Sequence, residues 1–269
     1  MTNLSLPSSG FGTFRLKGDQ AYKATQDALD VGFRHIDTAQ IYENEDKVGQ
    51  AIQDSDIPRD EIFLTTKVWF DNFKKEKFID SVQDSLDHLK VSSVDLLLIH
   101  WPSPENEVPM TEYLEQLARC KQEGFTKNIG VSNFTKGHID KAIEILGERQ
   151  ILTNQIEVHP LFNNHELVQY CQKQNILITA YMPLAVGKVM ENKVLKELAE
   201  QKNTSPASIA LAWLNMKLMI SIPSSTNKAH MADNLAAKNI VLTDAEIARI
   251  DNIDHQDRIV DPDFAPKWD

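Results

Sequence analysis

Short apolar runs alternate with longer helical segments along the whole chain, and this alternation limits the fold more than any other feature of the sequence. Seven runs indicate β-strands, at residues 33–36, 62–66, 94–99, 127–131, 152–156, 176–181 and 219–222. An eighth, at residues 10–14, is weak in pattern and is included because the others leave room for a first strand. Runs such as 94–99 are almost entirely apolar, as expected of parallel strands covered on both faces. The alternation therefore predicts repeated βαβ units.

The segments between these runs have the hydrophobic spacing of amphipathic helices and the usual signals at their ends. Apolar side chains recur every three or four residues over residues 78–89. Thr111 precedes a second helix and Gly124 follows it, whereas Ser205 and Pro206 fit the N-cap and the first residue of a third. These signals support helices between the strands.

Eight βα units in 269 residues fit one closed barrel better than an open sheet. An open dinucleotide-binding sheet usually has a Gly-x-Gly-x-x-Gly turn after its first strand, and residues 10–12 lack the third glycine. No Pro/Gly-rich hinge marks a domain boundary. We therefore predict the α/β class and a single (β/α)8 TIM barrel over residues 1–269, with a C-terminal tail over the active-site rim.

The charge balance excludes several classes of partner. The net charge of −11 disfavours binding to nucleic acid or to an anionic membrane surface. The sequence shows neither a signal peptide nor an apolar stretch long enough to span a membrane, so we expect a cytoplasmic protein. Cys120 and Cys171 lie apart in helical segments and are interpreted as packing residues, and no metal site is expected. We expect a monomer that acts on a small molecule.

Ionisable side chains stand at the ends of successive strands. Asp37, Lys67 and His100 each follow an apolar run, and Tyr42 lies five residues beyond Asp37. In a barrel, these positions meet at the C-terminal rim. A buried lysine needs a partner, which Asp37 supplies, and its positive charge would help a nearby phenol to act as a general acid near neutral pH. This set predicts acid–base chemistry with Tyr42 as proton donor.

Each of these residues also has a purely structural interpretation. Asp37 and Lys67 could form a rim ion pair, Tyr42 could be a packing phenol, and His100 could be a hydrogen-bonded core histidine. Two other functions remain open at this point. One is a Schiff-base aldolase that uses Lys67 as nucleophile, and the other is a regulatory barrel that binds and senses a cofactor with little turnover.

Five ordered motifs resemble those of the aldo-keto reductases. They are Gly32-Phe33-Arg34-His35-Ile36-Asp37-Thr38-Ala39-Gln40-Ile41-Tyr42-Glu43-Asn44-Glu45, Thr65-Thr66-Lys67, Leu98-Ile99-His100-Trp101-Pro102, Gly130-Val131-Ser132-Asn133-Phe134 and Asn154-Gln155-Ile156-Glu157-Val158-His159-Pro160. The likeness covers almost the whole chain. It implies a catalytic tetrad of Asp37, Tyr42, Lys67 and His100. The residues 262–269 and the loops after Trp101 and Tyr181 look closest to the bacterial 2,5-diketo-D-gluconate reductases of the B type.

The resemblance also implies a nicotinamide cofactor and assigns residues to it. Ser132, Asn133 and Gln155 would hold its carboxamide, and Tyr181 would stack on its ring. The remaining cofactor-binding positions that the likeness implies are Thr13, Pro183, Leu184, Ser224, Ser225, Thr226, Lys228, His230 and Asn234. Trp69 and Trp101 would form the walls of the substrate pocket.

The phosphate-binding segment departs from the family pattern. Many members have a lysine where Ser224 stands and an arginine where His230 stands. The hydroxyls of this segment, the ammonium of Lys228 and the N-terminus of the following helix still offer groups for a phosphate. We therefore expect NADPH as cofactor, with NADH possible. The expected reaction is reduction of aldehydes and ketones, with 2,5-diketo-D-gluconate, methylglyoxal and other small carbonyls as candidate substrates.

Overall fold

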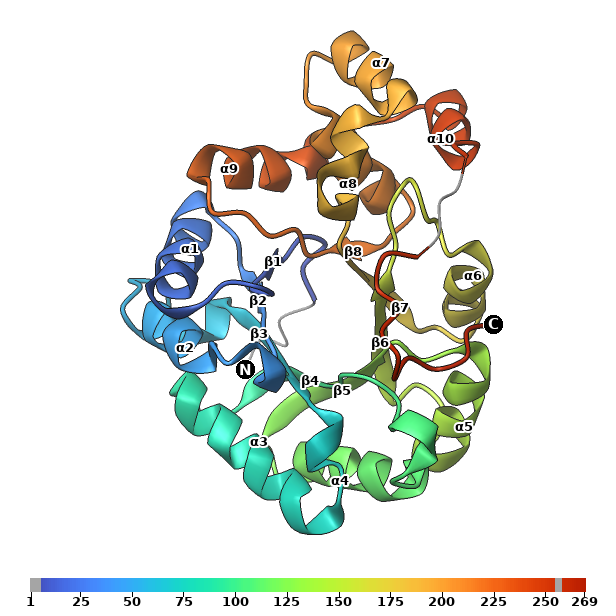
Figure 1. Cartoon of the computed structure of the whole chain (residues 1–269). Helices are drawn as coiled ribbons and strands as arrows, with labels where there is room; N and C mark the ends of the chain where they lie inside the picture. The colour runs from blue at the N-terminus through green and yellow to red at the C-terminus, as the bar shows by residue number, and fades with distance from the viewer. Residues whose placement is uncertain (1–5, 255–257) are drawn as a thin grey trace.

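Eight parallel strands form a barrel in a computed structural model that describes residues 6–254 and 258–269 (Figure 1). The strands are β1 (Phe11–Gly12), β2 (His35–Asp37), β3 (Phe63–Val68), β4 (Val94–Ile99), β5 (Thr126–Ser132), β6 (Ile151–Glu157), β7 (Leu177–Tyr181) and β8 (Ile220–Ser221), paired in sequence order. The ring closes where Gly10 N–H donates to the Ser221 carbonyl at 2.8 Å and Gly12 N–H donates to the Pro223 carbonyl at 3.0 Å. The predicted (β/α)8 barrel is confirmed.

Helices surround the sheet in the order that the sequence pattern requires (Figure 1). They are α1 (Gly18–Val31), α2 (Glu45–Gln53), α3 (Lys75–Leu89), α4 (Met110–Gln122), α5 (Lys136–Leu146), α6 (His165–Lys173), α7 (Lys193–Gln201), α8 (Pro206–Met216), α9 (Lys228–Ala236) and α10 (Asp244–Asp251). In Figure 1, α7 and α10 lie outside the ring beyond α8, and α9 lies beside α1. No helix among the described residues is both long and apolar enough to cross a membrane.

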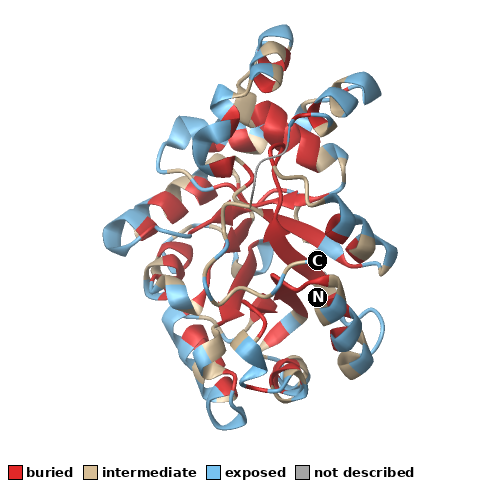
Figure 2. Ribbon diagram, turned by 45° about the vertical axis from the view of Figure 1, so that its right-hand side comes forward, coloured by how far each residue is buried: buried red, intermediate tan, exposed pale blue. Residues whose placement is uncertain are grey.

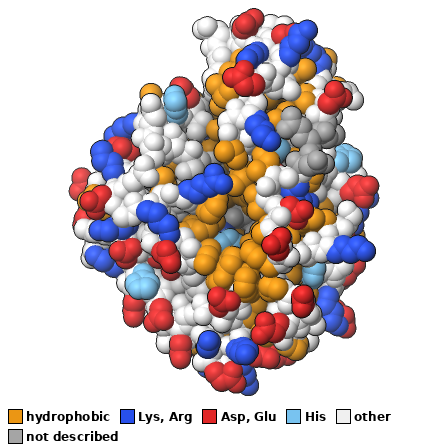
Figure 3. Space-filling model, in the orientation of Figure 1, with side chains coloured by type: hydrophobic (Ala, Val, Ile, Leu, Met, Phe, Trp, Pro, Cys, Tyr) orange, Lys and Arg blue, Asp and Glu red, His pale blue; other side chains and the backbone are white. Residues whose placement is uncertain are grey.

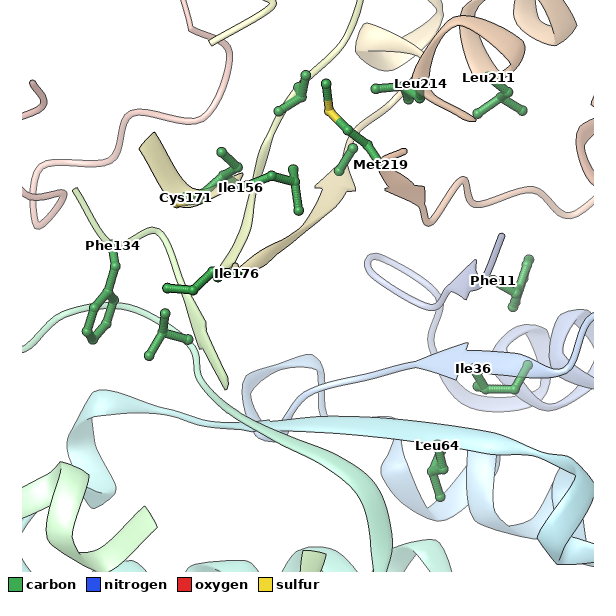
Figure 4. Close-up of a cluster of buried hydrophobic side chains, with 14 of the residues drawn as sticks. Phe11, Ile36, Leu64, Phe134, Ile156, Cys171, Ile176, Leu211, Leu214 and Met219 are labelled. Atoms are coloured by element: carbon green, nitrogen blue, oxygen red, sulfur yellow. The ribbon is translucent and has the colours of Figure 1, made fainter. Parts of the chain in front are cut away.

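The core fills the space between the sheet and the inward faces of the helices. The strands are buried along almost their whole length, whereas most helices are buried on one side only (Figure 2); α8 is the exception, because residues 208–214 are all buried. Figure 4 shows Ile36 and Leu64 on the strands, and Cys171 and Leu214 on helices, among the buried apolar side chains. Cys120 is buried in the same core, so both cysteines are packing residues. This two-sided burial explains why several strands lack an alternating pattern.

Local details differ from the sequence prediction at the ends of elements. The helix expected to follow Thr111 in fact begins at Met110, so that expectation was wrong. Pro109 stands at the N-cap there, where its fixed φ and missing N–H suit the entry to a helix. By contrast, Ser205 caps α8 as expected, because its hydroxyl accepts the Ser208 N–H at 3.1 Å.

Candidate active site

A cavity of about 1010 Å³ opens at the C-terminal ends of the strands. Figure 3 shows hydrophobic side chains gathered at the centre of this face, around a hollow. The cavity is lined by residues from the rim of the barrel, the loops and the tail: Gly12, Phe14, Arg15, Lys17, Asp37, Tyr42, Trp69, His100, Trp101, Ser132, Asn133, Gln155, Tyr181, Pro183, Leu184, Ser224 and Phe264 among them. This is the edge at which a barrel of this type places its chemistry.

Lys67 stands inside β3, with its ammonium completely buried beneath the cavity. Its Nζ donates to Asp37 Oδ1 at 2.6 Å and to the Thr38 carbonyl at 2.8 Å. Gln155 donates from Nε2 to Asp37 Oδ2 at 2.7 Å. Burial disfavours the ammonium, yet the interactions with Asp37 and Tyr42 together outweigh that penalty and raise the pKa of Lys67 above its usual value. The lysine is therefore a protonated, fixed cation.

Tyr42 stands on a short 3₁₀ turn, Gln40–Tyr42, directly after β2. Its hydroxyl lies 3.4 Å from Lys67 Nζ, and its ring faces the ammonium with a separation of 4.9 Å from Nζ to the ring centroid. Asn44 fixes the loop, because its side-chain amide donates to the carbonyls of Thr13 and Leu16 at 3.0 and 2.9 Å. The turn therefore holds the phenol over the buried ion pair.

The sequence predicts that the Lys67 ammonium favours the phenolate of Tyr42, but the net shift of the Tyr42 pKa is upward. Burial raises the pKa of this phenol, and the lowering effect of the Lys67 ammonium does not cancel the effect of burial. Tyr42 is consequently a protonated phenol throughout the neutral range. The nearby cation still favours the phenolate form relative to a phenol buried alone.

His100 follows β4 directly and forms the opposite side of the same cluster. Its ring meets the ring of Tyr42 edge to face, with centroids 5.6 Å apart. Burial and the Lys67 ammonium together lower the pKa of His100 well below its usual value, so its imidazole is neutral. Asn133 donates from Nδ2 to the His100 carbonyl at 3.0 Å and holds this end of the strand. Asp37, Tyr42, Lys67 and His100 thus meet at one place.

Amide and hydroxyl groups form a second wall of the cavity. Ser132 Oγ donates to the Gln155 carbonyl at 2.7 Å, and Tyr181 donates from its hydroxyl to Asn133 Oδ1 at 2.8 Å. Asn133 has a left-handed φ of 61°, a conformation that a short amide side chain tolerates better than most. Thr13, by contrast, donates from Oγ1 to the Asp37 carbonyl at 3.0 Å and is fully buried.

Among the positions expected to bind a phosphate, Ser224, Thr226, Lys228 and His230 are exposed, Ser225 is half-buried and Asn234 is buried. Lys228 does not stand free there: its Nζ lies 2.8 Å from Asp30 Oδ2 and 3.4 Å from Asp27 Oδ1, both on α1. The side chain of Asn227 already accepts the N–H groups of Ala229 and His230, which begin the helix α9. Among the positions assigned from sequence in this segment, Ser224 alone lines the cavity.

Sequence reasoning expected the C-terminal tail at this rim but missed two cations there and the part played by Phe264. Arg15 and Lys17 follow β1 and line the cavity, and Phe264 lines it from the C-terminal tail. Both cations lie just beyond the end of β1, as His100 does at β4. The weak pattern of this first strand hid the signal. Trp69 and Trp101, which the sequence did single out, also line the cavity.

Comparisons with known proteins agree with this geometry. The sequence model of the aldo/keto reductase family matches residues 9–255. A methylglyoxal reductase, DkgB, of Yersinia pestis is 46% identical over 99% of this chain and 100% of its own length. A glyoxal reductase of Bacillus subtilis is 33% identical over 95% of this chain and 92% of its own length. A solved structure assigned as a 2,5-diketo-D-gluconic acid reductase B matches with a TM-score of 0.94 and 39% identity, over 98% of this chain and 94% of that one. The chain therefore belongs to the aldo/keto reductase family and is an oxidoreductase.

Proposed function

We propose that this enzyme reduces small aldehydes and ketones with NADPH, and that Tyr42 donates the proton to the carbonyl oxygen. The observation that supports this role is the contact between the Tyr42 hydroxyl and the buried Lys67–Asp37 pair at the floor of the cavity. General acid catalysis by a positioned group contributes about 10² to 10⁴ in rate.

Each residue of the cluster has its own part in the proposed step. Burial keeps Tyr42 protonated until a carbonyl oxygen arrives, and the Lys67 ammonium stabilises the phenolate that develops as the proton leaves. Asp37 and Gln155 fix the position of that ammonium. The neutral imidazole of His100 orients the carbonyl oxygen, because it can donate a hydrogen bond without competing as a cation.

The residues present fit a nicotinamide dinucleotide. Ser132, Asn133 and Gln155 provide amide and hydroxyl groups along one wall, whereas Arg15 supplies positive charge at the same cavity, beside Lys17, whose ammonium lies 2.9 Å from Glu43. When bound, the dihydronicotinamide supplies the hydride. Tyr181, Pro183 and Leu184 provide an apolar face beside the amides, and Ser224 lies toward the exposed segment proposed for the adenosine phosphate. The remaining groups proposed there are Ser225, Thr226, Lys228, His230 and Asn234.

The substrate class proposed here follows the relatives. Two of them are named as reductases of methylglyoxal and glyoxal, which are small 2-oxoaldehydes. We propose the same class for this enzyme and include 2,5-diketo-D-gluconate as a second candidate. Action as a monomer and in the cytoplasm remains a prediction from the sequence.

Steady-state kinetics with NADPH and NADH test this function. The purified protein is expected to oxidise NADPH with methylglyoxal, and to do so with a higher kcat/KM than with NADH. Binding of NADPH without turnover on any carbonyl of a broad panel would contradict the proposal and indicate a cofactor sensor instead.

Borohydride treatment with a carbonyl substrate tests the aldolase alternative. A covalent adduct on Lys67 would support a Schiff base. The raised pKa of this lysine and its bond to Asp37 disfavour such an adduct, because only the neutral amine is a nucleophile.

A further inference from the structure

The C-terminal tail, residues 258–269, lies beside β6 and β7 on the face that holds the cavity (Figure 1). Ile259, Val260, Asp261, Pro262 and Phe264 line the cavity directly. None of them belongs to a helix or strand, so their positions depend on side-chain contacts with the barrel. Those contacts decide the shape of the substrate pocket.

Glu157 is the buried group that holds the start of this tail. It ends β6, two residues after Gln155, and its side chain is completely buried. Its Oε1 accepts the Ile259 N–H at 2.8 Å, and its Oε2 accepts the Val260 N–H at 2.8 Å. His159 Nε2 lies 3.0 Å from Oε1. Burial acts to raise the pKa of Glu157, but these hydrogen bonds outweigh it and lower the pKa, so the group is a carboxylate.

Phe264 is the part of the tail that reaches the substrate end of the cavity. Its ring packs edge to face against three aromatic rings, with centroid separations of 5.7 Å from Trp69, 5.1 Å from Phe70 and 5.4 Å from Trp101. Trp69 in turn contacts the ring of His100 at 5.2 Å. The tail therefore completes an aromatic wall that begins at the catalytic cluster.

The far end of the tail has its own attachment. Asp269 Oδ2 accepts the Lys136 N–H, at the N-terminus of α5, at 2.7 Å. Arg258, the first residue of the tail, stacks its guanidinium 3.6 Å over the ring of Trp268, whose Nε1 donates to Asp261 Oδ1 at 2.8 Å. The contacts of Asp269 and Trp268 restrain the end of the tail, whereas Glu157 fixes the register at which the tail enters the mouth of the cavity.

We propose that Glu157 is a positioning residue for substrate selectivity: by binding two consecutive N–H groups of the tail, it sets Phe264 in the aromatic wall that receives the apolar substituent of the carbonyl substrate. This inference rests on the proposed reductase function. It predicts a preference for carbonyl compounds with a flat apolar substituent. Small substrates that do not reach Phe264 gain nothing from the wall.

The two hydrogen bonds from the tail can be reduced to one by a single substitution. Ile259 and Val260 donate to different oxygens of the carboxylate. In the nearly isosteric variant Glu157→Gln, one of those oxygens becomes an NH₂ group, which cannot accept. Whichever way the amide is turned, one N–H of the tail loses its acceptor. The start of the tail then keeps one of its two hydrogen bonds to residue 157.

Two 2-oxoaldehydes that differ in one substituent serve as probes. With phenylglyoxal, E157Q is expected to raise KM about tenfold with kcat little changed, which corresponds to the loss of one charged hydrogen bond. With methylglyoxal, both parameters are expected to stay within about twofold. Hydrogen exchange of the amides near Val260 is expected to become faster. The matched control is Glu123→Gln, which removes a carboxylate from a surface pair with Arg119.

A double-mutant cycle tests whether Glu157 acts through Phe264. Phe264→Ala is expected to reproduce the KM effect for phenylglyoxal, and adding E157Q to that variant is expected to produce no further change. If E157Q does not fold, Val260→Pro removes one donor from the tail and leaves the carboxylate in place. Like E157Q, it is expected to raise KM for phenylglyoxal and to leave KM for methylglyoxal nearly unchanged.

Several results would overturn the inference. They are an equal loss with both substrates, no loss with either, unchanged hydrogen exchange in the tail, or additive effects in the cycle. These outcomes differ from failure of the proposed function, because in that case the unsubstituted enzyme itself would reduce neither compound.

Discussion

Replacing Tyr42 by phenylalanine removes one oxygen from the molecule and separates catalysis from stability. The Tyr42 hydroxyl lies at the long distance of 3.4 Å from Lys67 Nζ, and that ammonium keeps its bonds of 2.6 Å to Asp37 and 2.8 Å to the Thr38 carbonyl. Loss of so weak a contact should cost less than about 1 kcal/mol of unfolding free energy. Loss of the proton donor should lower kcat by about 10² to 10⁴.

The assay combines NADPH consumption with methylglyoxal, NADPH titration by tryptophan fluorescence, and urea unfolding. Tyr42→Phe is expected to bind NADPH as the unsubstituted enzyme does and to unfold at nearly the same urea concentration, yet to turn over hardly at all. The control is Tyr22→Phe, which removes a phenol that donates to Asp54 on the surface, at 3.0 Å. A Tyr42→Phe enzyme with kcat within about tenfold of the original would refute the assignment of the proton donor.

Three further predictions follow from the charged groups. Because burial raises the pKa of Tyr42 above its usual 10.0, kcat/KM for reduction should stay level through neutral pH and fall only above about pH 10 in a pH–rate profile. Burial lowers the pKa of His35 from 6.5 to about 4. As the pH falls from 6.5 to about 4, the unfolded chain therefore binds a proton at this histidine before the folded chain does, and the free energy of unfolding should drop by up to about 3 kcal/mol. His35→Gln should flatten that slope in urea titrations at several pH values, and an unchanged slope would contradict the assignment. Asp30→Asn should tighten NADPH binding by about two- to fivefold and leave NADH binding unchanged, because it removes the nearer of the two carboxylates that bind the ammonium of Lys228; equal effects on both cofactors would count against a phosphate contact.

The barrel was predictable because its signals are local and repeated. Strands such as β2 and β4 are buried on both faces, so the apolar run reveals them directly, and Asp37 and His100 come at the ends of such runs. Lys67 was found for the same reason, although it stands within its strand. β1 was hard to identify because it has only two residues and its pairing depends on partners far along the chain.

Other features depend on contacts that no local pattern encodes. Lys228 is bound by Asp27 and Asp30, which are about two hundred positions away. Nothing near Lys228 in the sequence indicates that these carboxylates would compete with a phosphate for its ammonium. The net pKa of Tyr42 depends on how deeply its loop is buried, and Asn44 contributes to that by binding the loop after β1. The role of Phe264 likewise becomes visible only once three distant aromatic rings surround it.

The short closing strands have a consequence for how ligand binding and stability are linked. β1 and β8 have two residues each, and the cavity is lined by Gly12 from one side of their junction and by Ile222, Pro223 and Ser224 from the other. The junction should open locally at a lower free energy than the interior of the sheet, where strands of six and seven residues pair. A dinucleotide that contacts both sides would bind the closed junction and not the open one. Its binding should therefore slow amide exchange at Gly10 and Gly12 more than elsewhere in the sheet, and raise Tm with ligand concentration.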